Sequence, residues 1–144
     1  MNFNNIFIIY PLMLVLVVIF WFFSSKRNKS KQESYAAEFL KKYPEAVKVY
    51  TQANGGFIVS YNLQIYSVND ELPAAFSDEQ GSGFYCKTGK NIIEVEYSTT
   101  RPGVIYKTVT KSTGATKIEV ETKAGENYFF YFDKDTNSFK LDIK

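Results

Sequence analysis

The chain opens with one long apolar run and then alternates between apolar and polar residues in short steps. The run from Ile6 to Phe23 holds eighteen residues without a charge. As a helix it reaches about 27 Å, close to the roughly 30 Å hydrocarbon thickness of a bilayer. Tyr10 and Trp21 lie toward its ends, where aromatic side chains favour the membrane interface. Residues 1–25 are therefore predicted to form a transmembrane anchor.

The flanks of this run favour an anchor that is kept over a signal peptide that is cleaved. A cleavable signal carries positive charge before its apolar part and small residues before the cut. Residues 1–5 contain no Lys or Arg, and the run ends in Trp21, Phe22 and Phe23. No cysteine follows, so the signal of a lipoprotein is missing as well. The sequence predicts an uncleaved, single-pass protein of the cell membrane.

A basic cluster after the run predicts its orientation. The cluster comprises Lys26, Arg27, Lys29 and Lys31, whereas the N-terminal flank has no Lys or Arg. Because positive residues favour the cytoplasmic side, the C-terminal domain is expected in the cytoplasm. The same four residues are candidate lipid contacts, since basic groups beside a membrane attract anionic headgroups. The alternative is an extracytoplasmic domain, exported on an uncleaved signal anchor.

Residues 26–45 are predicted to form a basic linker and a short helix. Good helix formers run from Gln32 to Lys42, and Pro44 disfavours helical geometry at the residue before it. An apolar stripe recurs at every fourth position, at Tyr35, Phe39 and Tyr43. The stripe is expected to pack on the sheet of the domain that follows, because a helix commonly covers an open sheet face. The alternative is a helix that lies on lipid.

Residues 46–144 alternate with a period of two and are divided by turn signals. This pattern predicts eight or nine short, mostly antiparallel strands, which is typical of an all-β sandwich-like domain. One long strand is expected to place Phe57, Val59, Tyr61, Leu63 and Ile65 on a single face. A later strand is expected to turn Ile93, Val95 and Tyr97 inward. Pro73 limits its neighbourhood to an edge strand, residues 77–82 are predicted to be a polar loop, and residues 104–110 a strand.

Several turn motifs recur in a fixed order between residues 63 and 132. They are Ile65 to Asp70, Gly83 to Val95, Lys117 to Val120 and Ala124 to Tyr128. In this order the segment resembles the PEGA-like and related small β-sandwich domains of bacterial envelope proteins. Thr88 stands where that pattern has a proline. The resemblance implies a noncatalytic sandwich module and assigns no functional residue; its relatives are exported, which favours the extracytoplasmic alternative.

The composition excludes several kinds of chemistry. The chain has no histidine, which removes Ser-His and Cys-His catalysis and imidazole metal sites. Its single cysteine, Cys86, excludes an internal disulfide and thiolate clusters. Residues 133–137 resemble the start of a calcium loop, but Ser138 and Lys144 replace the Gly and Glu that such a loop needs. No catalytic residue, metal ligand or cofactor is predicted. An enzyme based on carboxylates or on Lys and Tyr stays open as an alternative.

The aromatic run Tyr128–Phe132 departs from the alternation of a half-buried strand, since both of its faces are aromatic. Either the short helix covers the second face through Tyr35 and Phe39, or that face binds a partner. Burial is favoured, because the chain carries its own cover. Phe129, Tyr131 and Arg101 are the candidate partner surface, the last because it lies in a predicted loop at the end of the sandwich.

The charge is distributed unevenly. Residues 26–48 hold seven Lys or Arg and three Glu, a balance of +4, and residues 49–144 hold ten and twelve, a balance of −2. Because the folded domain is not basic as a whole, nucleic acid is not expected as a partner. The sequence predicts a membrane-tethered, noncatalytic binding or assembly module with a possible protein partner.

Overall fold

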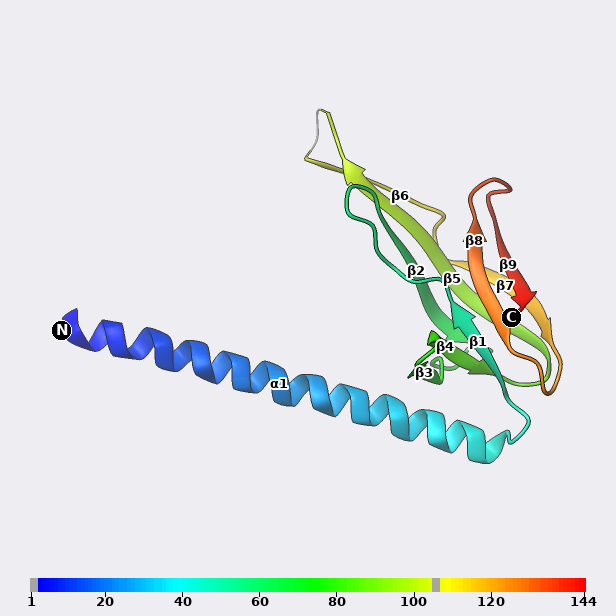
Figure 1. The fold of residues 1–144 in the computed structure, drawn as a ribbon, viewed down its shortest axis with the longest axis horizontal. Coiled ribbons are helices and arrows are strands. Elements are labelled where there is room, and N and C mark those ends of the chain that lie inside the picture. The colour runs from blue at the N-terminus through cyan, green and yellow to red at the C-terminus, as the bar shows by residue number, and fades with distance from the viewer. Residues whose placement is uncertain (1–2, 105–106) are drawn as a thin grey trace.

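The computed structural model describes residues 3–104 and 107–144, and side chains for residues 13–21, 30–104 and 107–144. In this part of the chain, one helix precedes nine strands (Figure 1). The elements are α1 (Phe3–Lys42), β1 (Val47–Thr51), β2 (Ser60–Val68), β3 (Ala75–Asp78), β4 (Gly81–Cys86), β5 (Gly89–Pro102), β6 (Thr108–Ser112), β7 (Thr116–Thr122), β8 (Tyr128–Asp133) and β9 (Ser138–Ile143). The prediction of a mostly β chain is confirmed.

α1 is a single helix of 40 residues. The predicted linker and short helix are therefore part of the same element as the apolar run. The helix ends at Lys42 as predicted, just before Pro44, and its last turn is closed by the Tyr43 N–H, which donates to the Phe39 carbonyl at 2.8 Å. Among the residues described, no helical stretch is long and apolar enough to cross a membrane. The predicted anchor extends into residues 6–12 and 22–23, whose side chains lie outside that description.

The nine strands form two sheets. Sheet A has the order β3-β4-β1-β8-β9, and sheet B the order β2-β5-β6, with β7 also paired to β5. The pairing of β1 with β8 is parallel, and the other pairings are antiparallel. The long strand β5 carries β2 along one edge, while its other edge carries first β7 and then β6. This arrangement is sandwich-like, as predicted.

The core lies between the two sheets. Phe84 and Phe130 from sheet A and Ile93 and Val95 from sheet B are at most 2 % exposed. Ile93, Val95 and Tyr97 point inward as predicted, because side chains at alternate positions of β5 share one face. Apolar burial of this kind is the main driving force for holding the sheets together.

A buried asparagine holds the start of β5. The Asn91 side chain donates to the Lys87 carbonyl at 2.7 Å and to Thr122 Oγ1 at 3.2 Å, and it accepts from Asn69 Nδ2 at 2.9 Å. Asn91 and Thr122 are almost fully buried. Since buried polar groups are costly unless they are paired, this network pins the turn before β5 to β7.

The long strand predicted from Phe57 is wrong at its beginning. β2 starts at Ser60, and Phe57 is fully exposed. The Gly55 N–H donates to the Tyr61 carbonyl at 3.0 Å, and the Tyr61 N–H donates back at 2.8 Å. Because Gly55 and Tyr61 pair with each other, the residues between them form a loop. Gly56 makes the loop possible with a φ of 116°, a conformation that favours glycine.

Two further boundaries differ from the prediction. Residues 77–82 are not a loop, because Asp78 pairs with Gly81 and closes a hairpin between β3 and β4. The predicted strand 104–110 begins only at Thr108, which is the last partner of Pro102. Val104 lies in the connection, and residues 105–106 lie outside the described part. Pairing with neighbouring strands sets these limits, which alternation alone does not encode. β3 is an edge strand, as Pro73 predicted.

Replacing Gly83 with alanine is expected to destabilise the domain by about 1–3 kcal/mol. A Cβ at this position would lie 2.1 Å from the Val49 carbonyl oxygen and 2.9 Å from the Tyr50 Cα, both backbone atoms of β1. The strands would have to move apart, and urea unfolding of Gly83→Ala measures the cost. Ser82→Ala, one residue away and exposed, is the control and should change stability by less than about 0.5 kcal/mol. Equal stability of the two variants would contradict the close approach.

Candidate functional site

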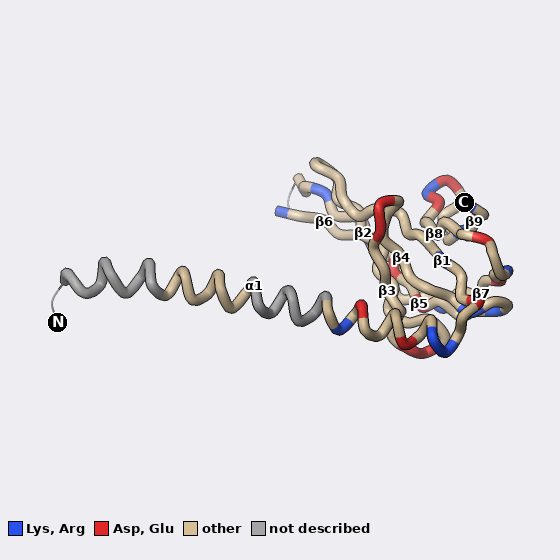
Figure 2. Tube along the Cα trace, turned by 60° about the horizontal axis from the view of Figure 1, so that its bottom comes forward, with Lys and Arg blue, Asp and Glu red and all other residues tan. Residues whose placement is uncertain are grey.

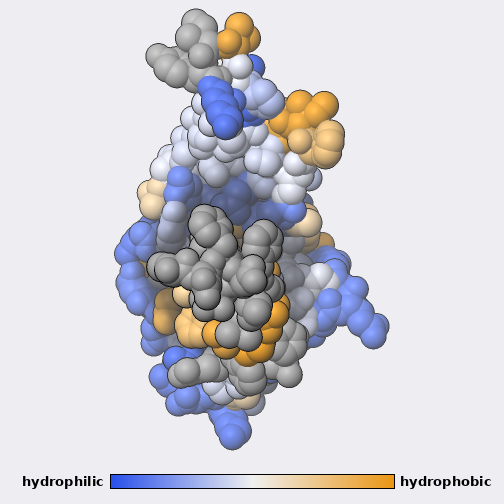
Figure 3. Space-filling model, turned by 90° about the vertical axis from the view of Figure 1, so that its left-hand side faces the viewer, coloured by the Kyte–Doolittle hydropathy of each residue, from blue (hydrophilic) through white to orange (hydrophobic). Residues whose placement is uncertain are grey.

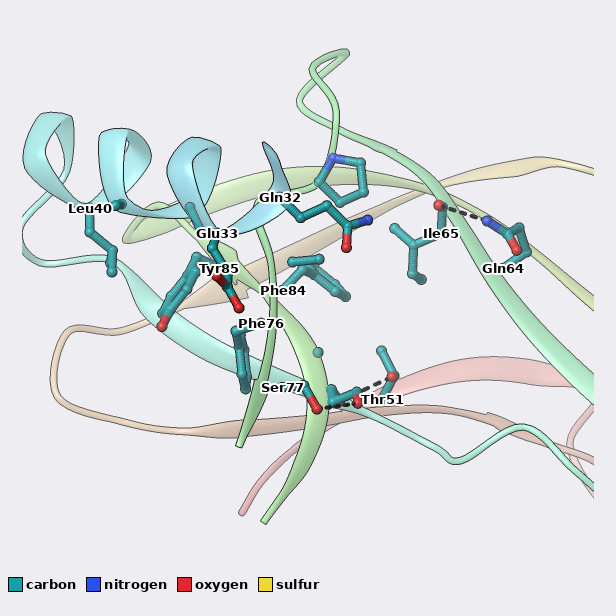
Figure 4. Close-up of a pocket in the computed structure, with 16 residues that line it drawn as sticks. Gln32, Glu33, Leu40, Thr51, Gln64, Ile65, Phe76, Ser77, Phe84 and Tyr85 are labelled. Carbon is teal, nitrogen blue, oxygen red and sulfur yellow. Dashed lines mark hydrogen bonds between the residues drawn. The ribbon is translucent and has the colours of Figure 1, made fainter. Parts of the chain in front are cut away.

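A groove of about 750 Å³ lies between the C-terminal part of α1 and the edge of sheet A formed by β3 and β4 (Figure 4). One wall is the helix, from which Gln32, Glu33 and Leu40 line the groove in the close-up. The facing wall is formed by Phe76, Ser77 and Tyr85, and Gln64 and Ile65 of β2 lie toward one end. The size falls in the range of pockets that bind ligands.

Helical spacing explains how α1 contributes to the groove. Residues three or four apart lie on one face of a helix, and the groove-lining positions of α1 follow this spacing. They are Gln32, Glu33, Ala36, Ala37 and Leu40. Ala36 is buried and its small side chain lets α1 approach β3, while Ala37 stays exposed at the rim. The helix therefore packs on the sheet, as expected, but mainly through Ala36 and Leu40 rather than through the predicted aromatic stripe.

The predicted aromatic stripe has a different role. Phe39 and Tyr43 stack on each other, with ring centroids 5.0 Å apart, and both are half-buried. Lys87 lies 4.5 Å from the centre of the Tyr43 ring, and Lys42 lies 5.3 Å from it. Hydrogen bonding to Lys87 and then to Lys42 lowers the pKa of Tyr43. These contacts hold the end of α1 against the turn after β4.

The chemistry of the groove suits binding and not proton transfer. Of the lining residues, Glu33 and Tyr85 are the titratable ones, and they come from opposite walls. Polar groups on the sheet side bond to one another: Ser77 and Ser82 hydroxyls are 3.1 Å apart, and Thr51 donates to the Ser82 carbonyl at 3.2 Å. Paired acid and base groups, which general acid–base catalysis needs, are not brought together in the groove.

A charged cluster next to the groove is structural. Lys48 Nζ lies 2.8 Å from an Asp78 carboxylate oxygen, to which the Tyr50 hydroxyl donates at 3.1 Å. The Lys48 hydrogen bond holds the pKa of Asp78 below its usual range, and burial first and then Asp78 raise the pKa of Tyr50. Lys144 Nζ sits 3.5 Å from the centre of the Tyr50 ring. The cluster ties β1 to β3 and to the C-terminal end.

The structure separates the residues of the predicted partner surface. Phe129 and Tyr131 lie on the outer face of β8 with their ring centroids 5.6 Å apart. Arg101 is exposed at the far end of β5, in the other sheet. Of the four candidate lipid contacts, Lys31 is exposed on α1, and the side chains of Lys26, Arg27 and Lys29 lie outside the described residues.

The helix does not cover the aromatic run of β8 as proposed from the sequence. α1 packs beside β3, which lies three strands away from β8 in sheet A (Figure 1). Phe129 and Tyr131 are half-buried without that cover, and the Tyr131 hydroxyl donates to Asp142 of β9 at 2.9 Å. The inner residues Tyr128, Phe130 and Phe132 are buried in the core.

Other residues with reactive or metal-binding potential are structural. Burial raises the pKa of the Cys86 thiol to about 12, so the thiol stays protonated and unreactive. Asp133 lies in the turn between β8 and β9, where it pairs with Lys140 and accepts from Thr136 Oγ1 at 2.8 Å. The segment that resembles a calcium loop is thus a hairpin turn. Within the described part of the chain, no three metal-binding side chains gather.

Glutamates on the outer face of sheet B are each paired with separate partners. Glu96 accepts from Ser112 and Tyr66, and the Ser112 hydrogen bond is the largest cause of a lowered Glu96 pKa. Glu94 accepts from Ser67 at 2.9 Å, and Glu119 pairs with Lys90 at 2.8 Å. They form no carboxylate pair of the kind that general acid–base catalysis uses.

The groove was not predicted from the sequence. Its helical side was available as the spacing of Ala36, Ala37 and Leu40, and its sheet side as the edge strand after Pro73, but their meeting depends on tertiary contacts. Comparisons with protein families, with curated proteins and with solved structures found no match to this chain.

Proposed function

We propose that this protein is a membrane-tethered, noncatalytic binding module. The apolar half of α1 is the tether, and the groove between α1 and sheet A receives an extended, apolar segment of a partner protein. The observation that carries the proposal is the groove itself, which is the right size for a ligand and lacks paired acid and base groups.

Exposure along α1 supports the tether. The nine successive residues from Met13 to Trp21 are all large and apolar, and each is at least 45 % exposed. A helix that is apolar on every side is unfavourable in water and belongs in a protein core or in lipid. The folded domain does not cover these residues, so lipid is the environment that fits them.

The edge strand supports a protein segment as the occupant. β3 is the last strand of sheet A on the side of the groove, and an edge strand offers unpaired backbone groups for the addition of another strand. Phe76 and Tyr85 provide aromatic surface beside it, and Leu40 provides aliphatic surface from the helix. An extended segment with alternating apolar side chains complements both properties.

The basic cluster after the apolar run supports an orientation with the domain in the cytoplasm. In that orientation the partner is a cytoplasmic protein or the cytoplasmic part of another membrane protein. An exported domain, which the sandwich resemblance favours, would take its partner from outside the cytoplasm.

A photo-crosslinking amino acid at Ala37 is expected to capture a discrete protein partner in native membranes. Ala37 is exposed and lines the groove, so a probe there lies within reach of any occupant without disturbing the core. Electrophoresis and mass spectrometry of the irradiated membranes identify the adduct. A second copy of the chain in the adduct would identify the groove as a site of self-association.

The same probe at Ala124 is the matched control, because Ala124 is an exposed alanine in the turn between β7 and β8. A bulky Leu40→Trp substitution, which narrows the groove, should reduce the Ala37 adduct at least tenfold. Equal adducts at Ala37 and Ala124, or no adduct at Ala37, would contradict a binding role of the groove.

A further inference from the structure

Apolar and basic side chains meet at one end of sheet B. We define the distal tip as Phe57, Ile58, Arg101, Val104, Lys107 and Lys111. Phe57 is 103 % exposed, Ile58 71 % and Val104 104 %. The three basic residues are exposed as well. Side chains this apolar are costly to leave in water, so their position at the ends of two connections needs an explanation.

Strand pairing places the two connections side by side. Ser60, the first residue of β2, pairs with Thr100 near the end of β5, and Pro102 pairs with Thr108 across the β5–β6 hairpin. Figure 3 shows apolar and basic surface together at this end of the molecule. The tip is therefore one surface made by the loop before β2 and the hairpin after β5.

The charge around the tip has a single sign. No Asp or Glu occurs from Ala46 to Asn69 or from Tyr97 to Ile118, whereas the second segment contains four Lys or Arg. The rest of the domain carries the excess of acidic residues. A surface of exposed apolar residues flanked by basic residues alone complements the acyl chains and phosphates of an anionic membrane.

The tip is also placed where a membrane would be. In Figures 1 and 2 the β5–β6 hairpin extends back along α1 and ends beside the middle of the helix, away from its C-terminal end. A bilayer entered by the N-terminal half of α1 has its surface at about that level.

We propose that the distal tip docks on the anionic lipid surface of the bilayer that α1 enters, with Phe57, Ile58 and Val104 reaching into the headgroup boundary. The location of that bilayer rests on the proposed function, while the lipid preference rests on the tip alone. Docking at a second point fixes the domain against the membrane, so the groove is held at a constant height above the lipid.

The test uses the full chain in nanodiscs of phosphatidylcholine, with or without phosphatidylglycerol. A polarity-sensitive fluorophore is attached to Phe57→Cys, and the buried Cys86 thiol does not compete for the label. Nitroxide lipids labelled near the headgroup are expected to quench this probe, more strongly in the anionic discs. A probe on Ala124→Cys, at an exposed turn, is the control and should not be quenched.

Charge reversal separates lipid docking from other causes of quenching. The triple variant Arg101→Glu, Lys107→Glu and Lys111→Glu should lower the quenching of the Phe57→Cys probe to the control level. Each basic group lost is worth about a fivefold decrease in affinity for an anionic surface. Quenching that is absent, or that is unchanged by lipid charge and by the triple variant, would overturn the proposal, as would shielding of the probe only when another protein is added.

The tether and the tip fail in different ways in this experiment. A chain that co-migrates with the discs but shows no quenching retains the tether and refutes the tip. A chain that leaves neutral discs but binds anionic discs with a quenched probe supports the tip and refutes the tether.

Discussion

Replacing Leu14 and Val17 together with arginine is expected to release the chain from membranes. Fourteen of the eighteen residues from Ile6 to Phe23 are Leu, Ile, Phe or Val. Each such residue favours insertion by roughly 0.3–0.6 kcal/mol, and a central Arg opposes it by roughly 2.5–3.5 kcal/mol. The twelve that remain contribute about 4–7 kcal/mol, which two arginines offset with about 5–7 kcal/mol. Carbonate extraction of isolated membranes should move the variant into the supernatant.

The matched control places the same substitutions further along the helix. Ser30 and Ser34 of α1 are exposed and lie outside the apolar run, so Ser30→Arg with Ser34→Arg adds the same charge without a desolvation cost. This control should stay in the pellet like the unmodified chain. A chain that is already extracted without substitution, or a Leu14 and Val17 variant that remains in the pellet, would contradict the tether.

Phe130→Ala is expected to destabilise the β-domain by about 3–5 kcal/mol. Phe130 is fully buried in the middle of β8, and its ring stacks on Phe139 with centroids 5.9 Å apart. Truncation removes the ring from the core between the sheets and leaves a cavity that the surrounding strands cannot fill. Urea unfolding, followed by the loss of near-ultraviolet circular dichroism, measures the change in the free energy of unfolding.

Phe129→Ala is the control for this prediction, because the two residues are neighbours on one strand and have the same side chain. Phe129 points to the outer face of sheet A and is half-buried. Its loss should cost clearly less than the loss of Phe130, and about 1–2 kcal/mol is consistent with partial burial. A larger cost at Phe129 than at Phe130 would mean that the outer face is covered in solution.

The elements of this protein follow from local patterns, and so does part of their orientation. Alternation predicted which side chains of β5 face the core, because a strand turns successive residues to opposite sides. Pro44 marked the end of α1 and Pro73 the edge strand, since proline removes a backbone donor and restricts its neighbour. The absence of histidine excluded whole classes of catalysis before any fold was considered.

What followed only from the fold depends on which segments meet. The loop that exposes Phe57 exists because Gly55 pairs with Tyr61, and a continuous alternation does not reveal such a pairing. The helix packs beside β3 and not on β8, which is decided by the strand order of sheet A. The groove and the distal tip each join segments that are far apart in sequence. Periodicity reports the face on which a side chain lies, whereas the partner of that face is set by long-range packing.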